Sequence, residues 1–188
     1  MAVRPILITG DPALHTPALA VTAFDRELRQ LVADMFETME AAPGVGLAAP
    51  QVGIGLRVFV FNWVDDEHRL WRGAAINPTL LVSPPPIGDL DEDTESEGCL
   101  SIPSERHPLR RSERAVLNAL DLDQHPFEVD AQGWLARIFQ HEFDHLNGVL
   151  YADRLDHYAA LDLAKAIKKA KWGVPGNSWT PGIDDIDA

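Results

Sequence analysis

The chain of 188 residues contains one cysteine, Cys99, so no disulfide can form within it. The absence of disulfides agrees with a reducing compartment. No apolar run is long enough to span a bilayer. The opening residues, with one arginine and a short apolar stretch, do not have the pattern of a secretory signal. We therefore expect a cytoplasmic protein that does not associate with a membrane.

Positive charge is also scarce. The chain has 16 Lys and Arg against 29 Asp and Glu, which gives a formal net charge of -13. Such a chain repels nucleic acid as a whole, although a local basic patch can still bind it. An apolar content of 46% and a charged content of 24% are ordinary for a globular protein, and the length suits one domain with a sizeable core.

Hydrophobic periodicity predicts three helices and at least four strands. Apolar residues at helical spacing predict helices over residues 26–42, 132–147 and 156–171. Alternating or β-branched stretches predict strands over residues 57–63, 74–82 with an interruption at Pro78, 115–123 and 126–131. This order favours an α+β fold, with a mostly antiparallel sheet packed around the second of the three helices.

Two segments lack such patterns. Residues 84–97 contain three prolines and six acidic residues, which predicts a solvated loop. Residues 173–188 are acidic and rich in Gly and Pro, which predicts a flexible tail. We therefore expect one domain over residues 1–172, followed by that tail.

The stretch QHEFDHLNG, residues 140–148, contains the pattern H-E-x-x-H. On a helix, His141 and His145 lie on one face and can bind the same metal ion. Glu142 is displaced by about 100° around the helix. It can therefore reach a water on that ion without being a ligand. The pattern is short, and two core histidines beside a surface glutamate explain it about equally well.

A third ligand is missing from the usual positions downstream. Tyr151 stands where the longer zinc peptidase pattern has its third histidine, and no glutamate follows Glu142. Residues 153–157 offer carboxylates and a histidine without a supporting pattern. Upstream, Cys99 offers a thiolate, which binds borderline metals well, although a lone cysteine is more often a small buried hydrophobe.

Three separate stretches resemble the motifs of the peptide deformylase family. GVGLAAPQ, residues 44–51, is similar to the first motif of that family, EGCLS, residues 97–101, to the second, and QHEFDH, residues 140–145, to the third. Their order and separation also agree with the family. The main departures are the acidic loop and the basic stretch at residues 104–114, and we expect neither to touch the chemistry.

The resemblance implies which residues carry the chemistry. It implies Cys99, His141 and His145 as metal ligands, and Glu142 as the general acid and base. It implies that two donors bind the developing oxyanion, the side-chain amide of Gln51 and the backbone N–H of Leu100. Residues implied to contact the substrate backbone are Gly44, Val45, Gly46, Gly98 and Arg106.

Methionine requires an apolar slot, and the helix that carries the ligands can supply one wall of it. Trp134 and Ile138 lie one or two turns before His141 on that helix. We expect both to line the slot, although core packing explains these two residues about equally well.

The implied reaction is removal of the formyl group from formyl-methionyl nascent peptides, with release of formate. The family implies one divalent metal ion per chain, with iron(II) as the working metal in the cell and zinc or nickel able to occupy a purified sample. A zinc endopeptidase and a metal-stabilised homologue without activity are the alternatives. Against the second, neither Glu142 nor Gln51 is needed to hold a structural metal.

The resemblance also implies a C-terminal helix that docks on the ribosome. Residues 154–172 contain five basic and two acidic residues, so their formal charge of +3 contrasts with the acidic chain. A solvated helix face is the simpler interpretation. Docking on ribosomal RNA near the nascent-chain exit is the alternative.

Overall fold

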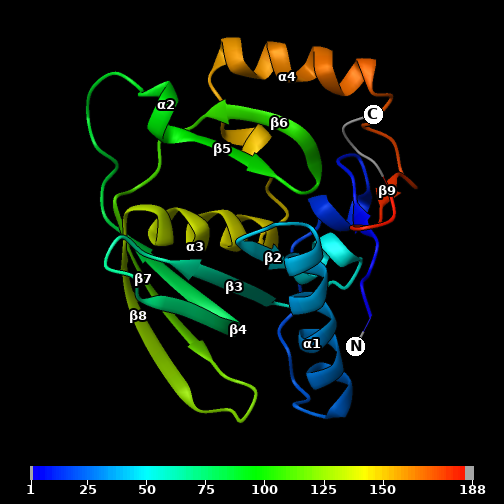
Figure 1. Cartoon of the computed structure of the whole chain (residues 1–188), viewed down its shortest axis with the longest axis vertical. Coiled ribbons are helices and arrows are strands. Elements are labelled where there is room, and N and C mark those ends of the chain that lie inside the picture. Colours follow the sequence, from blue (N-terminus) through cyan, green and yellow to red (C-terminus); the bar gives the residue numbers. More distant parts are fainter. Residues whose placement is uncertain (1, 185–188) are drawn as a thin grey trace.

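The computed structural model describes residues 2–184, and a five-stranded antiparallel sheet forms its framework. The strands follow one another in the sheet as β2 (Gly46–Ala48), β3 (Val58–Val64), β4 (Leu70–Val82), β7 (Arg114–Leu120) and β8 (Pro126–Gln132). Helix α3 (Gly133–Leu146) crosses one face of this sheet near the centre of the molecule (Figure 1). The α+β class and the central helix expected from the sequence are confirmed.

Helix α1 (Arg26–Ala41) covers another part of the core. It begins where the Asp25 carboxylate accepts hydrogen bonds from the backbone N–H groups of Glu27 and Leu28. Met35 and Met39 are fully buried in the cluster that contains β3 residues, so they pack the core and do not line a site.

Strand β4 runs through the predicted interruption. Its register with β7 shifts between Ile76 and Thr79, and Asn77 lies in the left-handed region with a φ of 51°. A bulge of this kind accommodates Pro78, which has no N–H for the ladder. The Asn77 side chain stabilises the bulge by bonding to both backbone groups of Val21.

A second, smaller layer lies on the other side of α3. Strands β5 (Ser96–Cys99) and β6 (Ile102–Pro108) form a hairpin, and helix α4 (His157–Lys169) lies beyond it, against β6 (Figure 1). Short 3-10 turns join these layers, namely η1 (Pro12–His15), η2 (Ala49–Val52) and η3 (Tyr151–Arg154). Helix α3 is therefore covered on both sides, which accounts for its apolar sequence.

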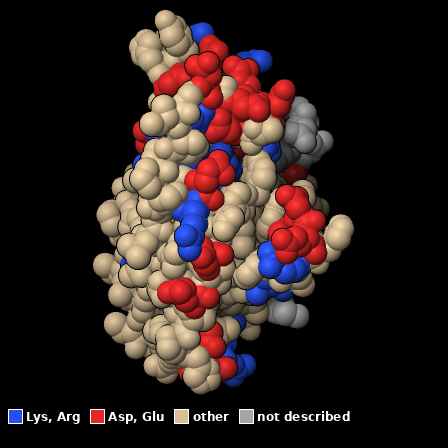
Figure 2. All heavy atoms as spheres, turned by 90° about the vertical axis from the view of Figure 1, so that its left-hand side faces the viewer, with Lys and Arg blue, Asp and Glu red and all other residues tan. Residues whose placement is uncertain are grey.

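The acidic loop before β5 contains one short helix, α2 (Glu92–Glu95). Most of the loop is exposed. Figure 2 shows the face that lies on the left-hand side of Figure 1, and acidic side chains gather on its upper part. The Arg110 guanidinium holds the loop by donating to the Pro86 carbonyl at 2.9 Å and to the Glu95 carboxylate at 2.9 Å.

The C-terminal segment differs from the loose tail that its composition predicts. Strand β9 (Ser178–Trp179) pairs with strand β1 (Ile6–Leu7) near the N-terminus. Trp179 is 6% exposed and belongs to the same core cluster as Ile6. The segment packs because this large aromatic side chain finds an apolar site. Residues 185–188 lie outside the described part.

In the described part of the chain, no helix has both the length and the apolar character needed to cross a membrane.

Candidate metal centre

Helix α3 carries both histidines and the glutamate of the H-E-x-x-H pattern, and the His141 side chain is 12% exposed. His145 is 1% exposed and Glu142 is 4% exposed. The helix ends at Leu146, and Gly148 follows in the left-handed conformation with a φ of 71°. A side chain at Gly148 would press on the backbone of Thr16, so glycine allows the chain to turn there.

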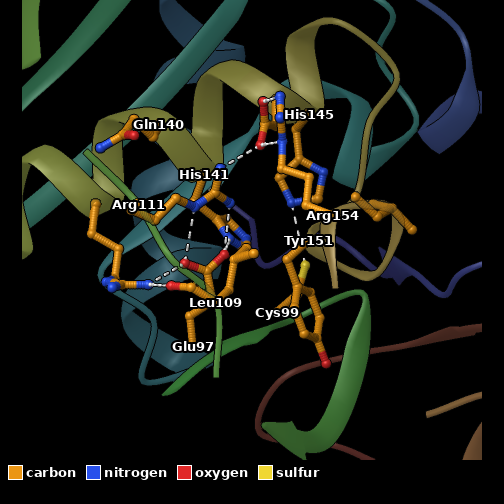
Figure 3. A network of polar contacts seen from close by, with 12 residues as sticks. Glu97, Cys99, Leu109, Arg111, Gln140, His141, His145, Tyr151 and Arg154 are labelled. Atoms are coloured by element: carbon orange, nitrogen blue, oxygen red, sulfur yellow. Dashed lines mark hydrogen bonds and ion pairs between the residues drawn. The ribbon is translucent and has the colours of Figure 1, made fainter. Parts of the chain in front are cut away.

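Three donor atoms converge beside α3. The Cys99 sulfur lies 3.2 Å from His145 Nε2, and the ligand atoms of Cys99, His141 and His145 all lie within 4.8 Å of one another (Figure 3). Cys99 reaches this point from the end of β5. The competing ligand Asp153 instead accepts a hydrogen bond from the Leu150 N–H and is used as a cap.

This donor set fits a catalytic metal ion. One thiolate and two imidazoles leave a coordination position open, as catalytic sites do, whereas structural sites are closed by four protein ligands. Two buried atoms beside the cluster, Glu142 Oε2 and His145 Nδ1, have no hydrogen-bond partner among residues 2–184. A metal ion with its water would give the carboxylate oxygen a partner.

Glu142 lies against the backbone of β2. A Cβ atom at Gly46 would fall 2.3 Å from Glu142 Oε1, so only glycine at position 46 leaves room for the carboxylate. Burial raises the pKa of Glu142 to about 7. The first and third sequence motifs thus meet at this contact.

Glu97 forms a hydrogen bond with the metal ligand His141, on the ring nitrogen that does not face the metal site. Its Oε1 atom lies 3.0 Å from His141 Nδ1, which leaves His141 Nε2 to face the metal site. Although burial opposes ionisation, the His141 and Arg111 side chains hold the pKa of Glu97 well below its usual value. The prediction that Glu97 belongs to a solvated loop is wrong, because this carboxylate is 3% exposed and fully paired.

An ion-pair network continues from Glu97 to the surface (Figure 3). Arg111 donates to Glu97 at 2.7 Å and to Asp144 at 2.6 Å, and Arg154 then pairs with Asp144 at 2.5 Å. Arg137 also donates to Glu97, at 2.9 Å. The basic stretch at residues 104–114 was expected not to touch the chemistry. Arg111 of this stretch is nevertheless buried and pairs with Glu97, the carboxylate that contacts His141.

Gln51 lies in η2 and approaches the cluster at Cys99. The Ala48 N–H donates to its Oε1 at 2.8 Å, which fixes the orientation of the amide. Its Nε2 group then points toward the Cys99 sulfur at 3.7 Å and the Ser101 hydroxyl at 3.3 Å. The amide therefore presents a donor to the space beside the ligands.

A cavity of about 500 Å³ opens onto the cluster. Its wall contains Cys99, His141, Glu142, Gln51 and Leu100, together with every residue that the sequence analysis assigned to substrate binding: Gly44, Val45, Gly46, Gly98, Arg106, Trp134 and Ile138. Ile138 is 3% exposed and packs in the core while it also lines the cavity, so its contact with the substrate stays a prediction.

Two tryptophans in the wall were not anticipated. The Trp63 ring lies 6.2 Å from the Trp134 ring, centroid to centroid, and Trp179 lines the cavity beside Leu100. The sequence offered only a general signal for them, which is that a large aromatic side chain rarely lies free in solvent.

Three metal-ligand atoms, a buried carboxylate and an open cleft define a metal-dependent hydrolase. The family model for polypeptide deformylase matches residues 3–160 of this chain. The chain is 47% identical to peptide deformylase 2 of Corynebacterium efficiens over 98% of its own length and 96% of that protein. It is 48% identical to the peptide deformylase of Mycolicibacterium paratuberculosis, over 97% and 96% of the two lengths.

Solved structures agree. A peptide deformylase from Legionella pneumophila superposes with a TM-score of 0.77 at 38% identity, covering 90% of this chain and 96% of the other. One from Synechococcus elongatus in complex with actinonin gives a TM-score of 0.76 at 38% identity, covering 91% and 90%. The chain belongs to the polypeptide deformylase family. Its activity is removal of the N-formyl group from nascent peptides, so the endopeptidase alternative is set aside.

Proposed function

We propose that the cleft places the formyl group of a formyl-methionyl peptide beside Cys99, His141 and His145, where Glu142 is the general acid and base. One observation carries this assignment. The Glu142 carboxylate is buried in the wall of the cleft, beside two of the ligands, with an oxygen that has no partner among the described residues. A buried polar atom of this kind needs a partner that arrives with the substrate or the metal.

When bound, a divalent metal lowers the pKa of a water and polarises the carbonyl group of the substrate. Glu142 accepts a proton from that water and passes it to the amine that leaves, so the products are formate and a free α-amine. Gln51 Nε2 and the backbone N–H of Leu100 donate hydrogen bonds to the formyl oxygen while negative charge develops on it. The carboxylate is shielded from bulk water, which keeps the proton within the site.

The glycine-rich segments would hold the peptide backbone. Strand β2 is an edge of the five-stranded sheet, and an extended peptide can add to such an edge. Gly44 and Val45 precede this strand in the cleft wall, and Gly98 lies in the wall contributed by β5. Arg106 is exposed and lines the same cleft, and we expect its guanidinium to donate hydrogen bonds to carbonyl groups of the peptide.

Methionine would occupy the apolar part of the same cleft. Trp134 and Ile138 form one wall there, and Val45 lies in the wall as well. Trp134 is 37% exposed, which leaves apolar ring surface for a methionine side chain to cover.

We propose iron(II) as the working metal, because a thiolate and two imidazoles suit iron(II) as well as zinc. Metal analysis of protein purified without oxygen decides between the two. We also propose that the enzyme acts in the cytoplasm, because its substrate is a nascent peptide chain.

Gln51→Ala is expected to lower kcat by about 100- to 1,000-fold, the usual effect of removing one oxyanion donor. KM and metal content should change little, because the amide binds the transition state more strongly than the substrate. Formate release from a short formyl-methionyl peptide measures the rates. Gln30→Ala, an exposed change on α1, is the control, and wild-type rates for Gln51→Ala would contradict the assignment.

We further propose that α4 docks on ribosomal RNA. All four lysines of the chain lie between residues 165 and 171, and all are exposed. Two of the five basic residues of the segment 154–172 already have acidic partners. Arg154 pairs with buried Asp144, and Lys165 pairs with Asp162 at 2.7 Å. Lys168, Lys169 and Lys171 therefore supply most of the charge available for phosphates.

Changing the four lysines, Lys165, Lys168, Lys169 and Lys171, to alanine is expected to abolish salt-sensitive co-sedimentation with ribosomes. Hydrolysis of a short formyl-methionyl peptide should not change, because α4 lies away from the cleft wall. The matched control removes four exposed arginines elsewhere, Arg26, Arg29, Arg69 and Arg114. Equal loss of binding in both variants would assign the effect to net charge and refute docking through α4.

A further inference from the structure

The C-terminal segment is bound to the N-terminal strand by several backbone contacts. Beyond the β1–β9 pairing, the Ile8 N–H donates to the Asn177 carbonyl at 3.0 Å, and the Gly173 N–H donates to the Thr9 carbonyl at 3.0 Å. This double segment carries Trp179 to the cleft wall. The tail is therefore part of the structure that surrounds the metal centre.

Trp179 makes one specific polar contact there. Its indole N–H donates to the Leu100 carbonyl at 2.8 Å, while the Thr9 N–H donates to the next carbonyl, that of Ser101, at 2.8 Å. Leu100 and Ser101 form the turn between β5 and β6, closed by the pairing of Cys99 with Ile102. The two terminal segments of the chain thus hold both carbonyl groups of this turn.

The same turn carries two parts of the active site. Cys99, the last residue of β5 before the turn, is a metal ligand, and the Leu100 N–H is the proposed oxyanion donor. The two peptide planes that meet at the Leu100 Cα atom are linked by its φ and ψ angles. A hydrogen bond that fixes the Leu100 carbonyl therefore restricts the direction in which the Leu100 N–H points.

We propose that Trp179 is a positioning residue for deformylation. Through its indole N–H it holds the turn so that the Leu100 N–H stays aimed at the formyl oxygen beside Cys99. The proposal rests on the role of Leu100 given under Proposed function. Donors that are held in place before the reaction stabilise developing charge best. The C-terminal segment, through Trp179, would therefore contribute to stabilisation of the oxyanion.

Trp179→Phe tests this with the ring retained and the N–H removed. We expect kcat to fall by about 5- to 10-fold, the scale of one ordinary hydrogen bond, with KM and metal content unchanged. Trp172→Phe is the matched control. Trp172 is partly buried against the same core cluster, and its indole N–H donates no hydrogen bond among residues 2–184. It should keep the wild-type kcat.

A second measurement does not depend on activity. In zinc-loaded full-length protein labelled with 15N-leucine, the amide resonance of Leu100 should shift in Trp179→Phe and stay in place in Trp172→Phe. A fall in kcat without that shift, or equal effects of the two variants on kcat and melting temperature, would reduce Trp179 to a packing residue and overturn the proposal.

The Gln51→Ala result separates this inference from the proposed function. If Gln51→Ala is inactive and Trp179→Phe has the wild-type kcat, the oxyanion site stands and the positioning role fails. If Gln51→Ala itself has the wild-type kcat, the oxyanion assignment fails first, whatever Trp179→Phe shows.

Discussion

Glu142→Gln is expected to stop turnover while the protein keeps its metal. Glutamine has nearly the same shape but cannot accept a proton from water, and removal of a general base typically lowers the rate by about 100- to 10,000-fold. Metal content should equal that of the wild type, because the ligand atoms that converge at this site, among residues 2–184, belong to Cys99, His141 and His145. Formate release and metal analysis on one preparation measure both effects.

The control for this variant is Glu128→Gln, which makes the same change at an exposed position of β8. It should keep both activity and metal. Loss of metal from Glu142→Gln, at a wild-type circular dichroism spectrum, would make Glu142 a ligand and refute its role as general acid and base.

The helical part of the site could be predicted from local rules. His141, Glu142 and His145 lie within five consecutive residues, and a helix fixes their relative directions without knowledge of the fold. Cys99 is different, because it lies 46 residues before His145 in the chain. No local rule brings two such positions together, so ligand chemistry made Cys99 one candidate among several and the resemblance to a family singled it out.

Glu97 shows why the support behind the ligands was harder to find. Its neighbours in sequence are acidic and exposed, so composition assigned it to the solvated loop. One signal was present: in a strand, residues two apart share a face. Glu97 and Cys99 are two apart in β5, and both are buried. A carboxylate on the buried face beside a metal ligand is best explained as a partner of another ligand.

The remaining contacts of the site depend on packing of distant segments. Arg111 pairs with Asp144 across 33 positions of the chain, and Trp179 reaches Leu100 across 79. Arg111 resembles the exposed arginines around it, and Trp179 lies in a segment whose composition predicts disorder. Their roles follow from burial, and burial is decided only when β5, β6, α3 and the two chain ends are assembled.

Cys99→Ser is expected to lose both the metal and the activity. A serine hydroxyl stays protonated at neutral pH and is a poor ligand, so two neutral imidazoles would remain. We expect metal affinity to fall by more than about 100-fold, since loss of an outer partner alone can reach that size. The fold should persist, because serine is nearly the same size and the residue is a small part of its core cluster. Metal analysis, circular dichroism and formate release measure these effects.

Cys99→Asp separates ligation from packing. Aspartate restores a negatively charged ligand but not the sulfur, so metal content should lie between those of Cys99→Ser and the wild type. If Cys99→Ser kept full metal and full rate, the third ligand would have to come from elsewhere, and the 3.2 Å contact between the Cys99 sulfur and His145 Nε2 would be mere packing. If both variants lost metal equally while folded, the site would require the thiolate itself, as a borderline metal such as iron(II) or zinc does.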